Sequence, residues 1–539
     1  MNKKIIILLM AILVLCITLQ IIGIKWGLTT SNYFHFASFH PDESENIKAI
    51  ATLNPQKLDF KIDNPIITRG TFQIYLTAAW LKAVSVFGLI KVSPSFGYYK
   101  QNPAELVRLY FAGRSLSVLF GILTIILLFF IAKSVYNNYK IGLLASFFLA
   151  IAPVHIVWSH YIGTDIVLTF EICLIILLSH YITSKNKYYL ITGLISGLTI
   201  ATKYSSLPII VIPVIAHFVS DQRKILSKNL FIYIISIPIG FFIGNPYSLI
   251  EPNNFTTTIK LSLNINILRT SSGYDCFETL PGWIYYFTTA PKYALGIPFA
   301  LLSLCGLIYS ILKREKSDIL ILSFIFLLWL ELGFSPWRLV RWFVPFVPLL
   351  CLLSARFAFS IKKYKVLTTV IVSIISLYTF LYSYSYVKMM SEKDVRDSSS
   401  EWIEQNIPEG KKIAVSNMYF WNPSIAMTLY WYKETEPFYK GIKRYKILQI
   451  NNIKKLNTEK PDYVILSDYE YFPILKLKHK FPNEYILPFL NKVMNSGEYI
   501  LIKKFEKYPN IFGIKTIGGF YPHDWRYTCP TILIYKKAK

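Results

Sequence analysis

Long apolar stretches alternate with short polar segments over the first 386 residues, and the pattern changes beyond that point. The first stretch, 1–24, contains Lys3 and Lys4 at its start and is about long enough to cross a bilayer. Because no small-residue cleavage site follows, it predicts an uncleaved first span with its N-terminus inside. Further apolar stretches lie at 106–132, 140–158, 165–183, 188–220, 229–250, 284–312, 318–334, 339–360 and 364–386.

Small basic clusters between these stretches predict the topology, because Lys and Arg are retained on the cytoplasmic side. Placing every cluster inside requires 188–220 to be a hairpin that turns near 203–206, and requires 68–90 to lie along the outer surface. The sequence then predicts about eleven spans, whereas a crossing 68–90 segment would invert every later loop. The clusters are Lys133/Lys140, Lys185/Lys187, Arg223/Lys224/Lys228, Lys313/Arg314/Lys316 and Lys362/Lys363/Lys365.

The polar segments divide the chain into two expected domains. The first, 1–386, is a helical membrane domain with an outer loop at 25–105, and the second, 387–539, is an extracytoplasmic α/β domain. Ser398 and Glu401 form a capping-box pattern that predicts a short helix at 402–406. The expected strands of this domain are 412–415, 463–466, 499–502 and 531–535.

Composition supports a membrane protein and argues against nucleic acid as a partner. Hydrophobic residues make up 53% of the 539 residues and charged residues only 16%, whereas soluble domains have roughly 25% charged residues. The net charge of +26 would by itself suggest nucleic acid, but the basic residues lie in short clusters between apolar stretches. We therefore expect an integral protein of the plasma membrane.

The six cysteines form no CxxC pair, so neither a zinc site nor a thioredoxin-type motif is indicated. Only Cys276 and Cys529 fall in polar segments. They could pair in an oxidising compartment or remain free thiols.

Two segments expected outside carry carboxylates. Asp42 and Glu43 are adjacent, so one could accept a proton from a hydroxyl group while the other orients the acceptor or a metal. A solvated loop that starts a helix is the alternative interpretation. Asp165 precedes an apolar stretch, where it either caps a helix or converges with Asp42 and Glu43 on one cavity.

Two further segments carry basic residues in unusual places. Lys203, followed by Tyr204, lies in the middle of a long apolar stretch, where an ionisable group is either functional or reaches to the interface. Arg338 and Arg341 are three residues apart on the outer side, next to Trp337 and Trp342. They indicate either an anionic ligand such as a lipid phosphate or an interfacial anchor.

Taken in order, these segments resemble the motifs of the GT-C glycosyltransferases, in particular the family of dolichyl-phosphate-mannose protein mannosyltransferases and lipid A aminoarabinose transferases. The likeness covers most of the chain and depends on the ordered set, because each motif alone is weak. His160 stands early in the second acidic motif, where the family often has a basic residue, and Trp342 replaces the usual aromatic residue. The matching segments are His40-Pro41-Asp42-Glu43, Asn64-Pro65 with Tyr75, Gly113-Arg114-Ser115-Leu116-Ser117, Ser159-His160 to Asp165, Gly197-Leu198 to Lys203, and Arg341-Trp342-Phe343-Val344-Pro345 to Pro348.

The resemblance implies a GT-C fold and a sugar donor linked to a polyprenyl phosphate. Transfer would occur outside the membrane, with inversion at the anomeric carbon, to a protein, lipid or glycan. Asp42 would activate the acceptor hydroxyl with Glu43 beside it, and Asp165 would position the acceptor or the sugar. Only some branches of the superfamily use a divalent cation, Mg²⁺ or Mn²⁺, for which Asp42 and Asp165 would be the ligands. The expected substrate-binding residues are His160, Lys203, Tyr204, Arg338, Arg341 and Arg69, of which Lys203, Arg341 and Arg338 would hold the lipid phosphate.

A transporter or flippase of lipid-linked sugars is the alternative function, because it too could use charged residues in a membrane cavity. Transporters usually have two similar halves with interrupted spans at matching positions, and this sequence shows no such repeat. A carrier also has little use for an outer domain of about 150 residues. A surface-assembly protein with a polymer-binding tail would need far fewer spans. The sequence therefore favours a transferase.

Overall fold

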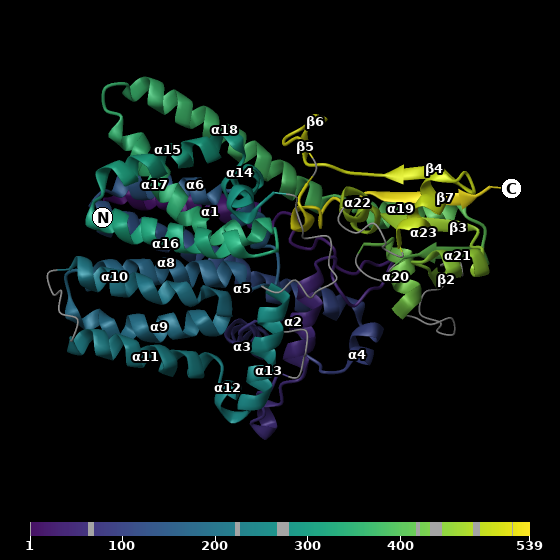
Figure 1. Ribbon diagram of the computed structural model, residues 1–539, viewed down its shortest axis with the longest axis horizontal. Helices are drawn as coiled ribbons and strands as arrows, with labels where there is room; N and C mark the ends of the chain where they lie inside the picture. The colour runs from purple at the N-terminus through teal and green to yellow at the C-terminus, as the bar shows by residue number, and fades with distance from the viewer. Residues whose placement is uncertain are drawn as a thin grey trace.

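The computed structural model describes residues 2–62, 69–220, 227–266, 280–416, 421–431, 445–477, 486–519 and 521–538. Figure 1 shows a helical bundle, with the N-terminus at its far end, and a smaller part with a β-sheet that carries the C-terminus at the opposite end. This arrangement confirms the expected class, a helical membrane protein with a C-terminal α/β domain. Among the residues discussed above, Asn64, Pro65, Arg223, Lys224 and Cys276 lie outside the described ranges.

The bundle contains two groups of apolar helices that fall on the expected stretches. Six segments of the described residues are long and apolar enough to cross a membrane: α1 (Lys3–Ile21), α5 (Pro103–Tyr136), α8 (Asp165–Ile182), α16 (Lys316–Phe334), η5 (Val340–Phe346) with α17 (Val347–Ser360), and α18 (Lys365–Ser391). The shorter ones are α6 (Tyr139–Ala150), α9 (Tyr189–Thr202), η3 (Tyr204–Ile210) with α10 (Val211–Val219), α11 (Lys228–Gly244) and α15 (Ile297–Lys313). Length and composition do not decide which of the shorter helices cross a bilayer, so the count of eleven spans stays a prediction.

Two stretches that the sequence presents as continuous are interrupted. The stretch 140–158 is divided into α6 and α7 (Pro153–Trp158), and Pro153 occupies the first turn of α7. The stretch 284–312 is divided into α14 (Gly282–Leu295) and α15 at Gly296, whose φ is +81°. Proline lacks the N–H that would continue a helix, and glycine alone adopts a positive φ without steric cost.

The stretch 188–220 is a hairpin, as expected. α9 ends at Thr202, Lys203 is extended, and η3 and α10 lead the chain back beside α8 and α9 (Figure 1). α9 also packs closely on α11, where a Cβ at Gly197 would lie 2.1 Å from the carbonyl oxygen of Ile237. Small residues allow this close approach of two membrane helices, so α9 has a rigid support.

The outer loop contains short helices instead of a membrane span. It consists of α2 (Pro41–Ala51), η1 (Pro55–Lys57), α3 (Phe72–Val86) and α4 (Phe96–Gln101), and α12 (Tyr247–Ile250) and α13 (Pro252–Asn266) follow α11 on the same side. α3, which corresponds to the disputed 68–90 segment, packs against α2, α5 and α9. It is not among the candidate spans found in the described residues, and its position along the membrane surface stays a prediction.

The α/β part contains a five-stranded sheet in the order β2–β1–β3–β7–β4. β2, β1 and β3 are parallel, and β7 is antiparallel to both of its neighbours. The four expected strands coincide with β1, β3, β4 and β7, whereas the sequence did not indicate β2, whose central positions are only half-buried. The elements are α19 (Val395–Asn406), β1 (Lys412–Val415), α20 (Ser424–Trp431), β2 (Lys446–Gln449), α21 (Ile453–Glu459), β3 (Tyr463–Ser467), α22 (Asp468–Leu477), α23 (Ile486–Asn495), β4 (Tyr499–Phe505), β5 (Asn510–Ile511), β6 (Ile514–Lys515), η6 (His523–Trp525) and β7 (Ile532–Lys537).

The expected helix start near Trp402 is wrong, because α19 begins two turns earlier, at Val395. The side chain of Asp394 accepts the N–H of Arg396 at 2.8 Å and therefore supplies the cap. Ser398 lies inside the helix and donates its hydroxyl to the Asp394 carbonyl. α18 also continues past Val387 to Ser391, so only three residues separate the membrane helix from α19.

The two parts of the molecule share one apolar core. Trp525 and Tyr527 of the α/β part belong to the same buried cluster as Met390 of α18 and Tyr293 of α14. The indole N–H of Trp525 donates to the Tyr382 hydroxyl at 3.0 Å, and the Tyr386 hydroxyl donates to the Trp525 carbonyl at 2.8 Å. The α/β part is therefore packed onto the end of the bundle.

Candidate active site

The start of α2 points Asp42 and Glu43 into different surroundings. His40 caps this helix, its ring Nδ1 accepting the N–H of Asp42 at 3.3 Å, and Pro41 occupies the first turn. Burial lowers the pKa of His40 to about 4, so the ring is neutral and able to accept. Neighbouring helical residues project about 100° apart, which leaves the Asp42 side chain 28% exposed and the Glu43 side chain fully buried.

Two arginines hold the Asp42 carboxylate. Arg341 Nη1 donates to Asp42 Oδ2, and Arg69 Nη1 lies 3.6 Å from the same oxygen. Arg69 is itself oriented by Asn46 of α2, whose Oδ1 accepts from Arg69 Nη2 at 2.9 Å. Burial alone would raise the pKa of Asp42, but the two guanidinium groups outweigh it and hold this pKa well below the usual range. Asp42 is therefore ionised at neutral pH.

A second ion pair, Asp165 with Lys203, lies on the other side of Arg341. Lys203 Nζ is 3.1 Å from Asp165 Oδ1 and 5.6 Å from the ring centroid of Trp342, the residue next to Arg341. The charge of Asp165 also acts on Arg341. The structure thus brings together the four segments that the sequence singled out.

Gly70 brings the outer loop against the end of α9. A Cβ at this position would lie 1.9 Å from the carbonyl oxygen of Ala201 and 3.0 Å from the carbonyl carbon of Thr202. Only glycine allows the two backbones to touch. Arg69 and Lys203, which flank this contact, are consequently kept next to each other.

Glu43 is enclosed by donors. Arg114 Nε lies 2.9 Å from Oε1 and Arg114 Nη2 lies 2.6 Å from Oε2, while the Ser38 hydroxyl and the N–H of Ile162 donate to the same oxygens at 2.5 and 2.8 Å. Burial would raise the pKa of Glu43, but Arg114 keeps it below the usual range. Arg114 also donates to the carbonyl of Trp26 at 2.8 Å, so the pair joins α2, α5 and the end of the first helix.

Three expected substrate-binding residues contact the protein itself. Both ring nitrogens of His160 lie 2.8 Å from backbone carbonyls, those of Ile156 and Ile22. The Tyr204 hydroxyl accepts from Asn245 Nδ2 at 2.9 Å. Arg338 Nε donates to the Leu280 carbonyl at 3.2 Å. These contacts hold loops and helix ends in place.

Asp524 is a residue of the site that sequence reasoning did not find. It comes from η6 of the α/β part, is 4% exposed, and accepts the backbone N–H of Val340 at 3.0 Å and of Arg341 at 2.8 Å. These N–H groups open η5 and have no partner within that helix. Burial raises the pKa of Asp524 to about 6, although the two N–H groups and Arg341 oppose the shift.

Aromatic rings surround the Asp42–Arg341 pair. The guanidinium carbon of Arg341 is 5.6 Å from the ring centroid of Trp158. The ring of His40 lies 4.4 Å from that of Tyr161 and 5.0 Å from that of Tyr527, a residue of the α/β part. These rings restrict the side chains that orient Asp42 and Arg341.

The donor set for a metal is poor. The described residues contain no group of three His, Cys, Asp or Glu side chains that could hold a metal ion. Asp42 and Asp165, the expected ligands, are each engaged by cationic side chains. We therefore derive no step through a metal ion.

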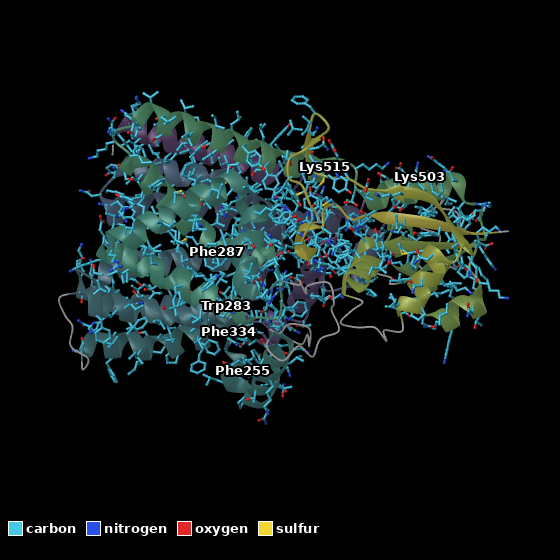
Figure 2. All side chains as sticks on the ribbon, turned by 45° about the horizontal axis from the view of Figure 1, so that its top comes forward. Phe255, Trp283, Phe287, Phe334, Lys503 and Lys515 are labelled. Atoms are coloured by element: carbon cyan, nitrogen blue, oxygen red, sulfur yellow. The ribbon has the colours of Figure 1, made fainter. Side chains whose placement is uncertain are left out.

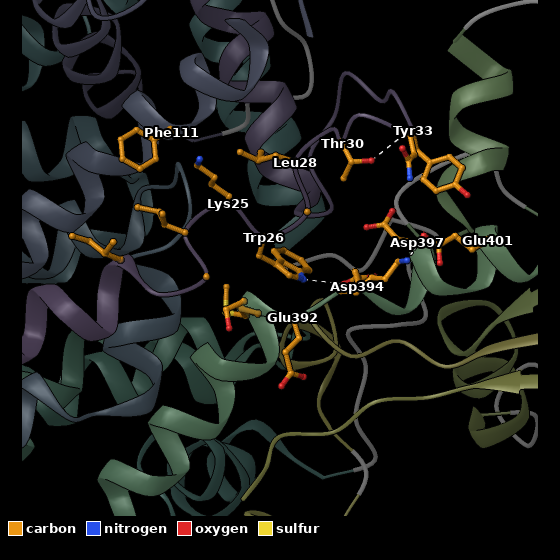
Figure 3. Close-up of a pocket in the computed structure, with 18 residues that line it drawn as sticks. Lys25, Trp26, Leu28, Thr30, Tyr33, Phe111, Glu392, Asp394, Asp397 and Glu401 are labelled. Carbon is orange, nitrogen blue, oxygen red and sulfur yellow. Dashed lines mark hydrogen bonds and ion pairs between the residues drawn. The ribbon is translucent and has the colours of Figure 1, made fainter. Parts of the chain in front are cut away.

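A pocket of about 570 Å³ lies elsewhere, between the end of α1 and the start of α19 (Figure 3). Its lining includes Trp26 and Asp394, which are hydrogen-bonded to each other at 2.9 Å, but no residue of the expected site. Its acidic side chains have partners: Lys507 lies 2.9 Å from Glu392, and the Ser424 hydroxyl donates to Asp397 at 2.6 Å. The pocket is therefore not the candidate active site.

Known proteins share a region of the sequence and the fold. Residues 107–247 match the family model described as dolichyl-phosphate-mannose-protein mannosyltransferase. This region contains Arg114, Asp165 and Lys203, and it contains neither Asp42 nor Arg341. No curated protein sequence matches the chain significantly.

Two solved structures resemble most or nearly all of the chain. The apo oligosaccharyltransferase of Archaeoglobus fulgidus has a TM-score of 0.52 at 11% identity, and the match covers 86% of this chain and 70% of that chain. ArnT from Cupriavidus metallidurans, bound to undecaprenyl phosphate, has a TM-score of 0.50 at 10% identity, and the match covers 99% of this chain and 98% of that chain. At such identities the likeness shows a shared fold.

Proposed function

We propose that this chain is a membrane glycosyltransferase of the GT-C superfamily, which transfers a sugar from a polyprenyl-phosphate-linked donor to a hydroxyl group of a protein, lipid or glycan. The observation that carries the proposal is the ionised Asp42 carboxylate that pairs with Arg341 and Arg69, while the charge of Asp165, the partner of Lys203, also acts on Arg341. A base for a hydroxyl group and cations for a phosphate are thereby within one site. The oligosaccharyltransferase and ArnT folds support this type of chemistry by analogy.

Asp42 is proposed as the base that accepts the proton of the acceptor hydroxyl. While Arg341 and Arg69 pair with it, Asp42 binds a proton weakly. A lipid phosphate is a stronger partner for these arginines, and its arrival would draw their charge away from Asp42. The pKa of Asp42 would then rise toward the range of a useful base, so the acceptor would be activated only after the donor has bound.

Lys203 and Arg341 are proposed to stabilise the leaving group. As the acceptor oxygen attacks the anomeric carbon from the opposite face, the bond from that carbon to the phosphate oxygen breaks and its electron pair remains on the phosphate. The configuration at the anomeric carbon is inverted. Cations already oriented toward the developing charge lower the barrier of this step, and Asp165 keeps Lys203 oriented.

Four of the expected site residues are proposed to hold neighbouring parts of the protein in place, without contacting the substrate: Glu43, His160, Tyr204 and Arg338. The four donors on Glu43 leave it no free oxygen for the substrate, so it fixes α2 and thereby Asp42. The other three hold backbone or amide groups near the site.

The site is proposed to face the extracytoplasmic side of the plasma membrane. The charge rule supports this orientation, because the basic clusters that follow α5, α8 and α15 lie at the ends of helices remote from α2. The α/β part, which follows the outer end of α18, would then also be outside.

The test is transfer by purified protein in nanodiscs supplied with a panel of radiolabelled polyprenyl-phosphate sugars and with membrane extracts as acceptors. Wild type should release polyprenyl phosphate and label an acceptor, and Asp42→Asn should reduce the rate by about 10²- to 10⁴-fold, because general-base catalysis is lost. Glu45→Gln, on the same helix but paired with Lys48, is the matched control. Unchanged transfer by Asp42→Asn would contradict the assignment of Asp42.

The same panel of donors distinguishes a transferase from the alternative function, a transporter or flippase. A carrier would move a donor across the bilayer of sealed vesicles without consuming it. Movement of intact donor, with no transfer from any member of the panel, would therefore favour a flippase.

A further inference from the structure

Two apolar side chains at the tip of the β5–β6 hairpin are exposed. Phe512 in the turn is 96% exposed and Ile514 in β6 is 74% exposed. Phe512 and Gly513 both have positive φ values, +50° and +80°, as the tight turn between two antiparallel strands requires. Asparagine or glycine suits such a position far better than a bulky aromatic residue, so this phenylalanine is unfavourable for the turn itself.

The hairpin lies against α18, a candidate membrane span. The Tyr378 hydroxyl donates to the Thr516 carbonyl at 3.0 Å, and the hydroxyls of Ser385 and Thr516 are 2.8 Å apart. Both α18 residues fall within the apolar stretch 364–386. In Figure 1 the hairpin projects from the α/β part beside the end of α18, where the bundle meets the sheet. It therefore lies at the depth of the membrane boundary.

The neighbouring face of α18 continues the apolar surface of the tip. Ile374 is 63% exposed, Leu377 is 58% exposed and Tyr384 is 38% exposed. On a membrane helix, exposed residues of this kind face lipid. Phe512 and Ile514 are further exposed apolar residues on the hairpin whose β5 strand contacts this helix.

Basic and aromatic residues flank the tip. Lys515 Nζ lies 3.5 Å from the ring centroid of Tyr508, and Figure 2 shows Lys515 next to the bundle, whereas Lys503 on β4 lies out on the sheet. Lys507 Nζ lies 3.1 Å from the carbonyl of Lys393, just beyond the end of α18. An apolar tip with lysine and tyrosine beside it is the composition of a segment that sits in a lipid headgroup layer.

We propose that the β5–β6 hairpin inserts Phe512 and Ile514 into the membrane leaflet on the side of the α/β part, with Lys515 at the level of the lipid phosphates. The α/β part would then be held in two ways, by its packing on the bundle and by this contact with the bilayer. The inference does not depend on the proposed reaction.

Photo-crosslinking tests the insertion directly. The photoreactive residue p-benzoylphenylalanine replaces Phe512 in the full chain, which is placed in nanodiscs of phosphatidylcholine and phosphatidylglycerol and irradiated. Because the side chain at this position is almost fully exposed, folding should be unaffected. We expect lipid adducts, identified by mass spectrometry, on peptides that contain position 512.

The matched control carries the photoreactive residue at Ile500, which is 58% exposed on the edge strand β4. The yield of lipid adducts at 512 should exceed that at 500 by at least about tenfold. Equal yields at the two positions would overturn the proposal, and so would crosslinking of 512 to a protein instead of lipid in native membranes. In a second variant, the photoreactive residue at Ile514 should lose its adducts when Phe512→Asp is added, because a charged tip is expelled from the apolar layer.

Discussion

Asp42 and Glu43 are neighbours in the chain, but they differ in exposure and in the partners of their charges. Asp42 is partly exposed and shares its charge with two arginines that a phosphate could recruit. Glu43 is fully buried, and Arg114 neutralises it. The sequence indicated that this acidic pair is important, but it could not tell the two residues apart, because burial depends on helix packing that involves distant residues.

Glu43→Gln should destabilise the fold by about 3–5 kcal/mol, because it leaves the Arg114 guanidinium buried without its counter-charge. Chemical unfolding of the detergent-solubilised protein, followed by tryptophan fluorescence, measures the change. Glu45→Gln, which weakens a partly exposed ion pair with Lys48, should cost less than about 1 kcal/mol. Equal effects of the two substitutions would contradict the structural role, and adding Arg114→Met to Glu43→Gln should recover part of the loss.

Lys203→Gln should raise the KM for the lipid-linked donor about 10- to 100-fold, with a much smaller effect on the KM for the acceptor. The physical reason is the loss of a cation that Asp165 and Trp342 hold next to Arg341. Steady-state kinetics with each substrate varied in turn separates the two constants. Lys187→Gln, at the other end of α9, should leave both constants unchanged, whereas an equal rise in both after Lys203→Gln would argue against a phosphate contact.

At the scale of elements, the sequence predicted the helices and strands that depend on a local pattern of residues. The apolar stretches became helices, and the four expected strands are present because short apolar runs with β-branched residues mark them. α19 shows the limit, since both Asp394 and Ser398 are good caps, and Asp394 is held by Trp26, which is 368 positions away in the chain. β2 escaped prediction because it is short and its side chains are not deeply buried.

η5 gives a prediction at this scale, because Asp524 orders its first turn. The pKa of Asp524 is about 6, above the usual value of an aspartate, so its carboxylate forms as the pH rises through about 6. Activity should rise over the same range, since the carboxylate holds the N–H groups of Val340 and Arg341 more firmly than the protonated acid does. Asp524→Asn should lower kcat and remove this step from the pH profile. An unchanged step in the variant would assign it to another group.

The two neighbouring histidines do not explain such a step. The pKa of His40 is lowered to about 4, and that of His523 lies well below its usual value. The contribution of Asp524 to stability changes with pH in the opposite direction to its contribution to activity. Between about pH 4 and 6 the native state keeps the Asp524 proton that the unfolded chain has released, so stability attributable to Asp524 falls as the pH rises.

At the scale of the whole molecule, the surplus of 26 positive charges describes topology and site more than surface character. By the charge rule the clusters between helices are predicted to lie on the cytoplasmic face, while Arg69, Lys203 and Arg341 pair with two carboxylates, Asp42 and Asp165, in the candidate site. The sequence predicted this division because charge and apolarity alternate along the chain. The predicted domain boundary at residue 386 stays a prediction, and Trp525 and Tyr527 pack the α/β part into the same buried cluster as the bundle.

The contact of Asp524 with Arg341 also bears on how the protein is made. The two residues are 183 positions apart, so a ribosome completes the membrane helices long before it synthesises the carboxylate that orders η5. During that interval the nascent chain has its basic residues in the membrane but lacks a completed active site. With the proposed function and orientation, competence to act on lipid-linked sugar would arise only when the last strand-bearing segment has crossed the membrane and folded back onto the bundle. Unfinished or truncated chains would be inactive, because Asp524 is synthesised after the membrane helices.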